Sequence, residues 1–244
     1  MCVVFRRNYA NRSNSAEWIL SRRLPVLLST KIPVAARTSP LSRKQVEEVL
    51  AELRLHHPNV DFDVHYIFTT GDLDQKTSLR TMGKSDFFTR EIDQQLLQGR
   101  ARIAIHSAKD LPEPLPEGLA VIAVTRGLTP ADALVLREGE SLQSLQKGAR
   151  IATSSERREE AVRKMRSDLT FIDLRGTIAQ RIEKLHTGEA DGAVIAEAAL
   201  IRLGLTHLNR VIIPGETVPG QGKLAIVARL DDPLIAELFQ CLDR

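Results

Sequence analysis

A cation beside a carboxylate ends one apolar run of this chain. Residues 103–112 read IAIHSAKDLP, so a stretch typical of a buried strand is followed by Lys109 and Asp110. Ligands of open α/β sheets bind at the carboxyl ends of the strands. A carboxylate in a partly desolvated cleft at that position can transfer a proton and stabilise positive charge. Asp110 is therefore the first catalytic candidate, and a surface ion pair with Lys109 is the alternative interpretation.

A second stretch joins an apolar run to a predicted helix through hydroxyl groups and paired arginines. Residues 152–158 read ATSSERR, which places Thr153, Ser154 and Ser155 at the start of that helix. Hydroxyls and free backbone N–H groups at a helix start bind anions, and guanidinium groups bind carboxylates with two hydrogen bonds. Helix capping by the same hydroxyls is compatible with this role. The stretch predicts an anionic ligand.

Several arginines follow predicted strands, either directly or one to two helical turns later. Because the carboxyl ends of parallel strands gather at one rim of a sheet, these guanidinium groups are expected to line one cleft. A ligand that carries several carboxylates would suit them. For any single arginine, a solvated surface position is the alternative. The residues are Arg37, Arg157, Arg158, Arg175, Arg181 and Arg202, with Ser39 placed after the first strand in the same way.

Composition excludes several classes of partner. The 244 residues are 43% hydrophobic and 27% charged, which is ordinary for a globular protein. The net charge of +3 comes from residues 1–31, which hold six basic residues and one acid, while 28 basic and 30 acidic residues follow. A nucleic-acid partner is therefore not expected. No apolar run approaches the roughly 18 to 20 residues of a membrane span, so no membrane association is expected.

The cysteine and histidine positions predict neither disulfides nor a metal. Cys2 and Cys241 lie near opposite ends of the chain and form no disulfide framework, which favours a reducing compartment such as the cytoplasm. The histidines show no ligand spacing, so no metal is predicted, and His106 is expected to be a packed core residue. Residues 1–31 are predicted to be a disordered extension or the product of an early start codon. An organellar transit peptide is the alternative.

From Ile32 onward, short apolar runs alternate with helix-period segments, which is typical of an α/β protein. Ser42 with Gln45, and Thr153 with Glu156, are predicted capping boxes at two helix starts. Crossings at 127–130 and within 214–222 predict lobe 1 from 32–126 plus 222–244 and lobe 2 from 131–219, with a cleft between them. Strands are expected at 32–36, 63–69, 102–105, 119–124, 149–152, 171–174, 192–196, 211–213 and 224–228.

The chain also carries separated short motifs in a fixed order: ARTSPL at 36–41, TGD at 70–72, HSAKD at 106–110, TSSERR at 153–158, LRG at 174–176, RLG at 202–204 and GQG at 220–222. The same motifs in the same order are typical of the porphobilinogen deaminase family, also called hydroxymethylbilane synthases. From about Ile32 to about Leu238, the chain resembles that family.

The resemblance implies a two-lobed fold of the type II periplasmic-binding-protein class, with mixed, mainly parallel sheets. It implies a transferase of haem and tetrapyrrole biosynthesis, a cytoplasmic monomer that joins four porphobilinogen units head to tail. The product is the linear tetrapyrrole hydroxymethylbilane, and ammonia is released. The implied cofactor is dipyrromethane, and neither metal nor nucleotide takes part.

The resemblance also implies roles for individual residues. The family counterpart of Asp110 is the catalytic acid, which holds the pyrrole N–H and stabilises the positive charge formed as ammonia leaves. Carboxylates of cofactor and substrate are implied to be held by Arg37, Ser39, Ser107, Lys109, Thr153, Ser154, Ser155, Arg157, Arg158, Arg175, Gly176, Arg181 and Arg202.

Two features depart from the family pattern. The sequence ends at Arg244, before the family's third domain and its cofactor-bearing cysteine loop, so a short form with that domain largely absent is expected. Cys241, on a predicted terminal helix, is a candidate for covalent attachment of the cofactor, and an ordinary packed thiol is the alternative. Two other functions stay open: a non-catalytic binder of a dicarboxylate or tetrapyrrole, and the effector domain of a transcription regulator.

Overall fold

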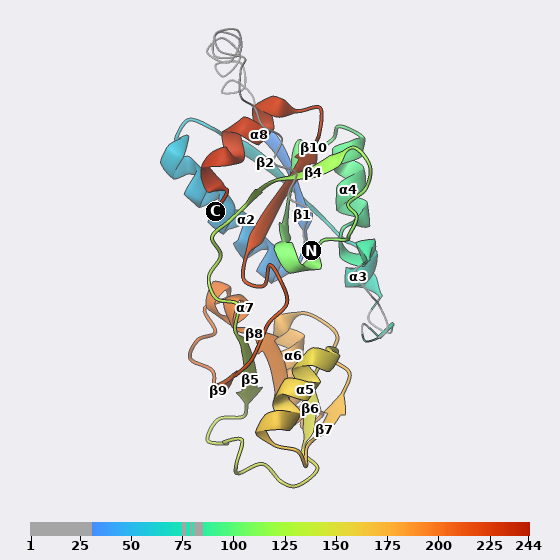
Figure 1. Cartoon of the computed structure of the whole chain (residues 1–244), viewed down its shortest axis with the longest axis vertical. Helices are drawn as coiled ribbons and strands as arrows, with labels where there is room; N and C mark the ends of the chain where they lie inside the picture. The colour runs from blue at the N-terminus through green and yellow to red at the C-terminus, as the bar shows by residue number, and fades with distance from the viewer. Residues whose placement is uncertain (1–30, 75–76, 79, 81–84) are drawn as a thin grey trace.

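Two five-stranded sheets, one above the other in Figure 1, organise the chain. The structure is a computed structural model that describes residues 31–74, 77–78, 80 and 85–244. The extension predicted over residues 1–31 therefore lies outside the described residues, apart from Lys31. Within the described part of the chain, no helix is long and apolar enough to cross a bilayer.

The first sheet has the strand order β2-β1-β3-β10-β4. Strands β1 (Ile32–Arg37), β2 (Phe62–Ile67) and β3 (Ile103–Ser107) pair in parallel. Strand β10 (Leu224–Arg229) is antiparallel to both of its neighbours, β3 and β4 (Leu119–Val124). A late segment of the chain thus returns to complete the sheet that the early segment begins. We call this sheet and its helices lobe 1.

Alternation along the strands of lobe 1 explains how its helices pack. Val34 and Ala36 face α2 (Pro40–His56), α8 (Pro233–Phe239) and the 3-10 turn η3 (Gln240–Leu242), whereas Ala35 faces α4 (Arg90–Leu97). Each of these side chains is fully buried, so both faces of the sheet are covered. Figure 1 shows α2 and α8 on one side of the sheet and α4 on the other.

The second sheet, with its helices, is lobe 2, and its strand order is β7-β6-β8-β5-β9. It repeats the pattern of the first: β6 (Arg150–Ala152), β7 (Thr170–Ile172) and β8 (Gly192–Ala196) pair in parallel, and β5 (Asp132–Leu136) is antiparallel to β8 and to β9 (Arg210–Ile213). Helix α5 (Glu156–Met165) covers one face, while α6 (Ile178–His186) and α7 (Glu197–Arg202) cover the other.

The predicted fold class, a two-lobed α/β protein with mixed sheets, is confirmed. The lobe boundaries drawn from the sequence stay a prediction. Strand β5 was not predicted, because its five buried residues follow the interval between the lobes without the helix that precedes most of the other strands.

Both predicted capping boxes were misplaced. Helix α2 begins at Pro40 with Ser39 as its cap, whose hydroxyl accepts from the Ser42 N–H at 3.2 Å. Proline is favoured in the first helical turn because its missing N–H needs no partner there, so the helix starts before Ser42. Helix α5 is capped by Ser155 rather than by Thr153. Ser39, the observed cap of α2, and Thr153, the expected cap of α5, both line the space between the lobes.

Candidate active site

A cavity of about 530 Å³ lies between the lobes, where the carboxyl ends of strands from both sheets meet. Three short elements help to form it: α3 (Thr70–Leu73) and the 3-10 turns η1 (Asp86–Phe88) and η2 (Ala108–Asp110). Among the residues predicted from the sequence, the lining includes Arg37, Ser39, Ser107, Lys109, Asp110, Thr153, Ser154, Ser155, Arg158, Arg175, Gly176, Arg181 and Arg202.

Asp110 and Lys109 lie on η2, directly after β3. The side chain of Asp110 is exposed to the cleft, so the partly desolvated carboxylate expected from the sequence is not what this structure shows. Asp110 is the last residue of η2, a short 3-10 turn in which no residue is buried. Lys109 donates to Gln221 Oε1 at 3.4 Å. Burial, assisted by the nearby charge of Arg158, lowers the pKa of Lys109 to about 8.

The paired arginines of α5 converge on a single buried carboxylate. Asp132, whose side chain is 2% exposed, accepts from Arg158 Nη2 at 2.6 Å and is also paired with Arg157. Burial alone would raise the pKa of Asp132, but Arg158 and Arg157 hold it below its ordinary value. Gln221 donates to the same carboxylate at 3.0 Å. Arg157 also donates to Glu216 O at 2.8 Å and is not part of the cavity lining, so it lies apart from the site predicted for it.

Two arginines of lobe 2 bring positive charge to the cavity without a carboxylate of their own. Arg181 donates to Gly176 O at 2.9 Å, and burial lowers its pKa to about 10, helped by Arg158 and Arg175. Arg175 donates to Gly71 O at 3.4 Å and to Asp74 O, and its Nε is buried without a partner. In the described part of the chain, no carboxylate forms an ion pair with Arg175, Arg181 or Lys109.

Two other arginines of the lining already hold carboxylates. Arg37 pairs with Asp72 through Nε, at 3.3 Å, and through Nη2. Burial would raise the pKa of Asp72, but Arg37 keeps it below its ordinary value. Arg202 is held by Glu48 on α2 and donates to Gly222 O at 2.9 Å. These two guanidinium groups have fewer free donors for a ligand than the sequence suggests.

The turn between β6 and α5 presents hydroxyls and amides to the cavity. The Ser155 hydroxyl accepts from the Arg158 N–H at 3.5 Å, and the Thr153 hydroxyl accepts from the Ser155 N–H at 3.3 Å. Ser154 Oγ accepts from the Leu174 N–H at 2.8 Å. Across the cleft, Ser107 Oγ accepts from Gln45 at 2.8 Å. Helix capping at this turn is observed for Ser155, and anion binding by its hydroxyls and amides stays a prediction.

Sequence reasoning missed Gln45, Asp72 and Phe88 as lining residues. The sequence pattern places Gln45 in a helix cap, although a buried amide on the apolar side of a helix is itself a signal of a polar contact. Phe88 lies on η1, and the guanidinium carbon of Arg37 is 4.4 Å from the centroid of its ring.

His106 and Cys241 pack in lobe 1. His106 is buried, as predicted, and burial lowers its pKa to about 4. Cys241 packs against the apolar core and donates weakly to Leu238 O at 3.6 Å. Burial raises the pKa of this thiol, which disfavours the reactive thiolate, and Cys241 is not part of the cavity lining. The structure therefore offers no support for attachment of a cofactor at Cys241.

Comparisons with known proteins agree with one another on the family. A family profile described as "Porphobilinogen deaminase, dipyromethane cofactor binding domain" matches residues 32–237. A probable porphobilinogen deaminase of Pyrobaculum neutrophilum is 40% identical over 215 residues, which are 86% of this chain and 73% of that protein. The porphobilinogen deaminase of Parasynechococcus marenigrum is 39% identical over 220 residues, which are 88% of this chain and 69% of that protein.

The solved structures support the expected architecture. A periplasmic substrate-binding protein of an ABC transporter from Coxiella burnetii superposes with a TM-score of 0.55 at 17% identity, covering 86% of this chain and 91% of that one. At this identity the likeness concerns the fold alone, and it confirms the two-lobed class predicted from the sequence.

Proposed function

The chain belongs to the porphobilinogen deaminase family, and we infer that it joins porphobilinogen units into hydroxymethylbilane with release of ammonia. It is thus a transferase of tetrapyrrole biosynthesis. The observation that carries this inference is the charge balance of the cavity. Lys109, Arg175 and Arg181 bring cations that, in the described part of the chain, have no carboxylate partner, while Asp110 offers one exposed carboxylate.

Porphobilinogen has the complementary chemistry, because its pyrrole ring bears an acetate and a propionate arm. Guanidinium groups bind such carboxylates through paired hydrogen bonds. The hydroxyls and amides of the Thr153–Ser155 turn add neutral donors. A growing chain of such units presents two carboxylates per ring, which fits a site where cations come from both lobes.

The residues present also fit dipyrromethane, the cofactor of the family. The buried Nε of Arg175 has no partner, and Arg181 donates to a backbone carbonyl through Nε alone among the described residues, so both have donors to offer to acidic side arms. We propose Arg175, Arg181 and Ser155 as residues that hold it. When bound, dipyrromethane supplies the free pyrrole α-carbon to which the first substrate unit is joined.

Asp110 is the proposed catalytic residue. In each addition the C–N bond of the substrate's aminomethyl group breaks and its nitrogen leaves as ammonia. The methylene carbon that remains forms a C–C bond with the α-carbon of the chain, and that α-carbon releases the proton that balances the step. The carboxylate of Asp110 accepts a hydrogen bond from the pyrrole N–H and stabilises the positive charge that develops on the ring. Lys109, next to it, anchors a substrate carboxylate and so orients the ring.

The cavity is lined by both lobes of one chain, so no second copy is needed to complete it. We therefore propose a monomer. Cys241 is a free thiol, which supports a cytoplasmic location. Sedimentation of the purified protein at micromolar concentration tests the first proposal, and a dimer would contradict it.

The function is tested by adding porphobilinogen to the purified protein. We expect ammonia and a linear tetrapyrrole that oxidises to coloured porphyrin. Calorimetry on the same preparation separates catalysis from binding alone. Heat of binding without ammonia would contradict the proposal and identify a binding protein that uses the same cavity.

A further inference from the structure

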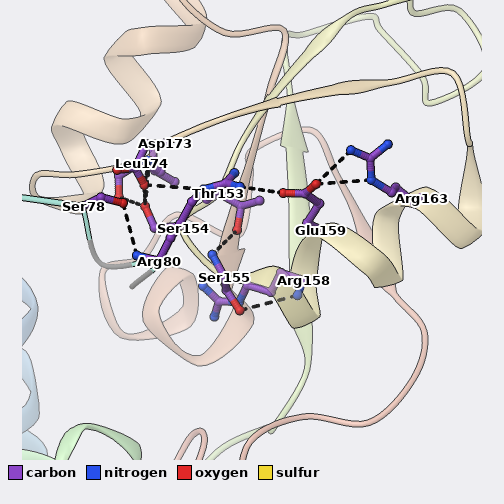
Figure 2. A network of polar contacts seen from close by, with 10 residues as sticks. All are labelled: Ser78, Arg80, Thr153, Ser154, Ser155, Arg158, Glu159, Arg163, Asp173 and Leu174. Atoms are coloured by element: carbon purple, nitrogen blue, oxygen red, sulfur yellow. Dashed lines mark hydrogen bonds and ion pairs between the residues drawn. The ribbon is translucent and has the colours of Figure 1, made fainter. Parts of the chain in front are cut away.

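Arg80, a residue of lobe 1, contacts lobe 2 next to the candidate active site. It is not among the site residues predicted from the sequence. Arg80 belongs to the segment that connects α3 to η1, yet its guanidinium lies on the turn between β6 and α5 (Figure 2). Nη2 donates to Thr153 O at 2.9 Å. Because Thr153 begins the turn whose hydroxyls line the cavity, Arg80 joins lobe 1 directly to the anion-binding element of lobe 2.

The same guanidinium forms an ion pair across the lobes. Arg80 Nη1 lies 2.9 Å from Glu159 Oε2, in the first turn of α5. The other oxygen of Glu159 accepts from Arg163 Nη2 at 2.8 Å, within the same helix. The side chains of Arg80 and Glu159 are 29% and 18% exposed, so their attraction is screened less than that of a fully exposed pair. One carboxylate thus has one partner from each lobe.

Asp173 extends the contact to the next hydroxyl of the turn. Its carboxylate lies 4.0 Å from Arg80 Nε and accepts from the hydroxyls of Ser154 and Ser78. Figure 2 shows the resulting network, with Ser78 and Arg80 from lobe 1 and the remaining residues from lobe 2. Arg80 therefore contacts the carbonyl of Thr153 and also Asp173, the carboxylate that accepts from Ser154.

We propose that Arg80 is a positioning residue, which holds the Thr153–Ser155 turn in the geometry that binds substrate carboxylates, and does so only while the lobes are closed on each other. This rests on the proposed function. Since the contacts of Arg80 with Thr153, Glu159 and Asp173 all reach from lobe 1 to lobe 2, a separation of the lobes breaks them together.

The test compares Arg80→Ala with Arg163→Ala. Steady-state kinetics with porphobilinogen should show a KM about tenfold higher in Arg80→Ala, with kcat changed less than about twofold, because a loss of carboxylate binding appears mainly in KM. Hydrogen exchange of the peptide that covers residues 150–158 should be faster in Arg80→Ala. Arg163→Ala removes the other partner of Glu159 without touching lobe 1, so both readouts should stay at wild-type values.

A second variant, Arg80→Lys, distinguishes loss of the Arg80 contacts from misfolding of the variant protein. Arg80→Lys keeps a positive charge for Glu159 but cannot reach Thr153 O with a second donor, so it should recover part of the KM change. Unchanged KM and exchange in Arg80→Ala, or equal changes in Arg163→Ala, would overturn the proposal. If the wild-type protein released no ammonia, the proposed function would fail, while the exchange comparison would still decide whether Arg80 orders the turn.

Discussion

The carboxylate of Glu48 on α2 holds the guanidinium of Arg202 on α7, with Nε 2.7 Å from one oxygen and Nη2 2.9 Å from the other. The pair crosses from lobe 1 to lobe 2, and the Arg202 side chain is only 4% exposed. Arg202 was predicted to hold a ligand carboxylate. In this structure the protein itself supplies that carboxylate, and the pair ties the lobes together.

Replacing Glu48 by Gln should therefore lower the free energy of unfolding and release the guanidinium donors of Arg202. Removing one partner of a largely buried ion pair leaves the other charge uncompensated. Because Glu48 is 30% exposed, we expect a loss of about 2 kcal/mol in the free energy of unfolding, measured by denaturant titration. Glu47→Gln is the matched control, since Glu47 is 60% exposed beside Lys44 in the same helix. An equal loss of unfolding free energy in the two variants would contradict a stabilising role for the ion pair between Glu48 and Arg202.

Arg181 should show a conflict between stability and binding. Its guanidinium is buried and, among the described residues, lacks a carboxylate, so its charge is costly until a ligand arrives. Arg181→Ala is expected to raise the melting temperature, yet also to raise KM for porphobilinogen roughly ten- to a hundredfold, as charge-assisted hydrogen bonds are lost. Arg90→Ala, at an exposed pair with Asp86, controls for loss of charge. An unchanged KM would remove Arg181 from the site.

The lowered pKa of Lys109 predicts that the activity depends on pH. Its pKa of about 8 means that the ammonium is present at neutral pH and is lost as the pH rises through 8. The value of kcat/KM should therefore fall above pH 8, and Lys109→Gln should be slower at all pH values but lack this fall. A wild-type profile that stays flat to pH 9 would contradict the assignment.

The lowered pKa of Lys109 also affects the free energy of unfolding, which should rise with pH where the activity falls. The unfolded chain keeps the Lys109 proton up to a pKa of about 10.4, so between about 8 and 10.4 it binds more protons than the native state. The contribution of Lys109 to the free energy of unfolding should therefore rise with pH in that interval. Denaturant titrations of the wild type and Lys109→Gln at pH 7.5 and 9.5 would show the difference.

Asp132, the buried carboxylate that pairs with Arg157 and Arg158, should be a position where substitution strongly lowers the free energy of unfolding. Asp132→Asn leaves Arg157 and Arg158 without their buried carboxylate, and we expect a loss of about 3 kcal/mol in the free energy of unfolding. Because these arginines lower its pKa, Asp132 contributes stability at neutral pH that is lost as the pH falls through its native pKa, below the unfolded value of about 3.9. The Asn variant should lack this part of the acid dependence. A variant as stable as the wild type would contradict the role.

Much of this site could be predicted because strand ends are readable in sequence. The runs that end at Arg37 and Ser107 are apolar and short, and the residues that follow them line the cavity. The turn at residues 153–155, which lines the cavity, could be predicted because its hydroxyls precede the charged helix α5. Local chemistry at an element boundary is a property of consecutive residues, so it needs no knowledge of the tertiary structure.

What the sequence could not predict depends on residues far apart in the chain. Nothing near Arg202 indicates that Glu48, on another lobe, will take its donors. Arg157 resembles Arg158 in sequence, but only the packed structure turns it toward Glu216, away from the cavity. The exposure of Asp110 is likewise a property of the packed structure, because η2 holds no buried residue and a strand-end pattern does not specify this.

The most direct test of the central claim measures ammonia release from porphobilinogen by the wild type and by Asp110→Asn, with calorimetry to confirm that both bind the substrate. Loss of a carboxylate that stabilises charge in the transition state predicts a rate lower by roughly a thousandfold, with binding changed only severalfold. An Asp110→Asn protein that released ammonia at the wild-type rate would contradict the assignment of Asp110 and the mechanism built on it.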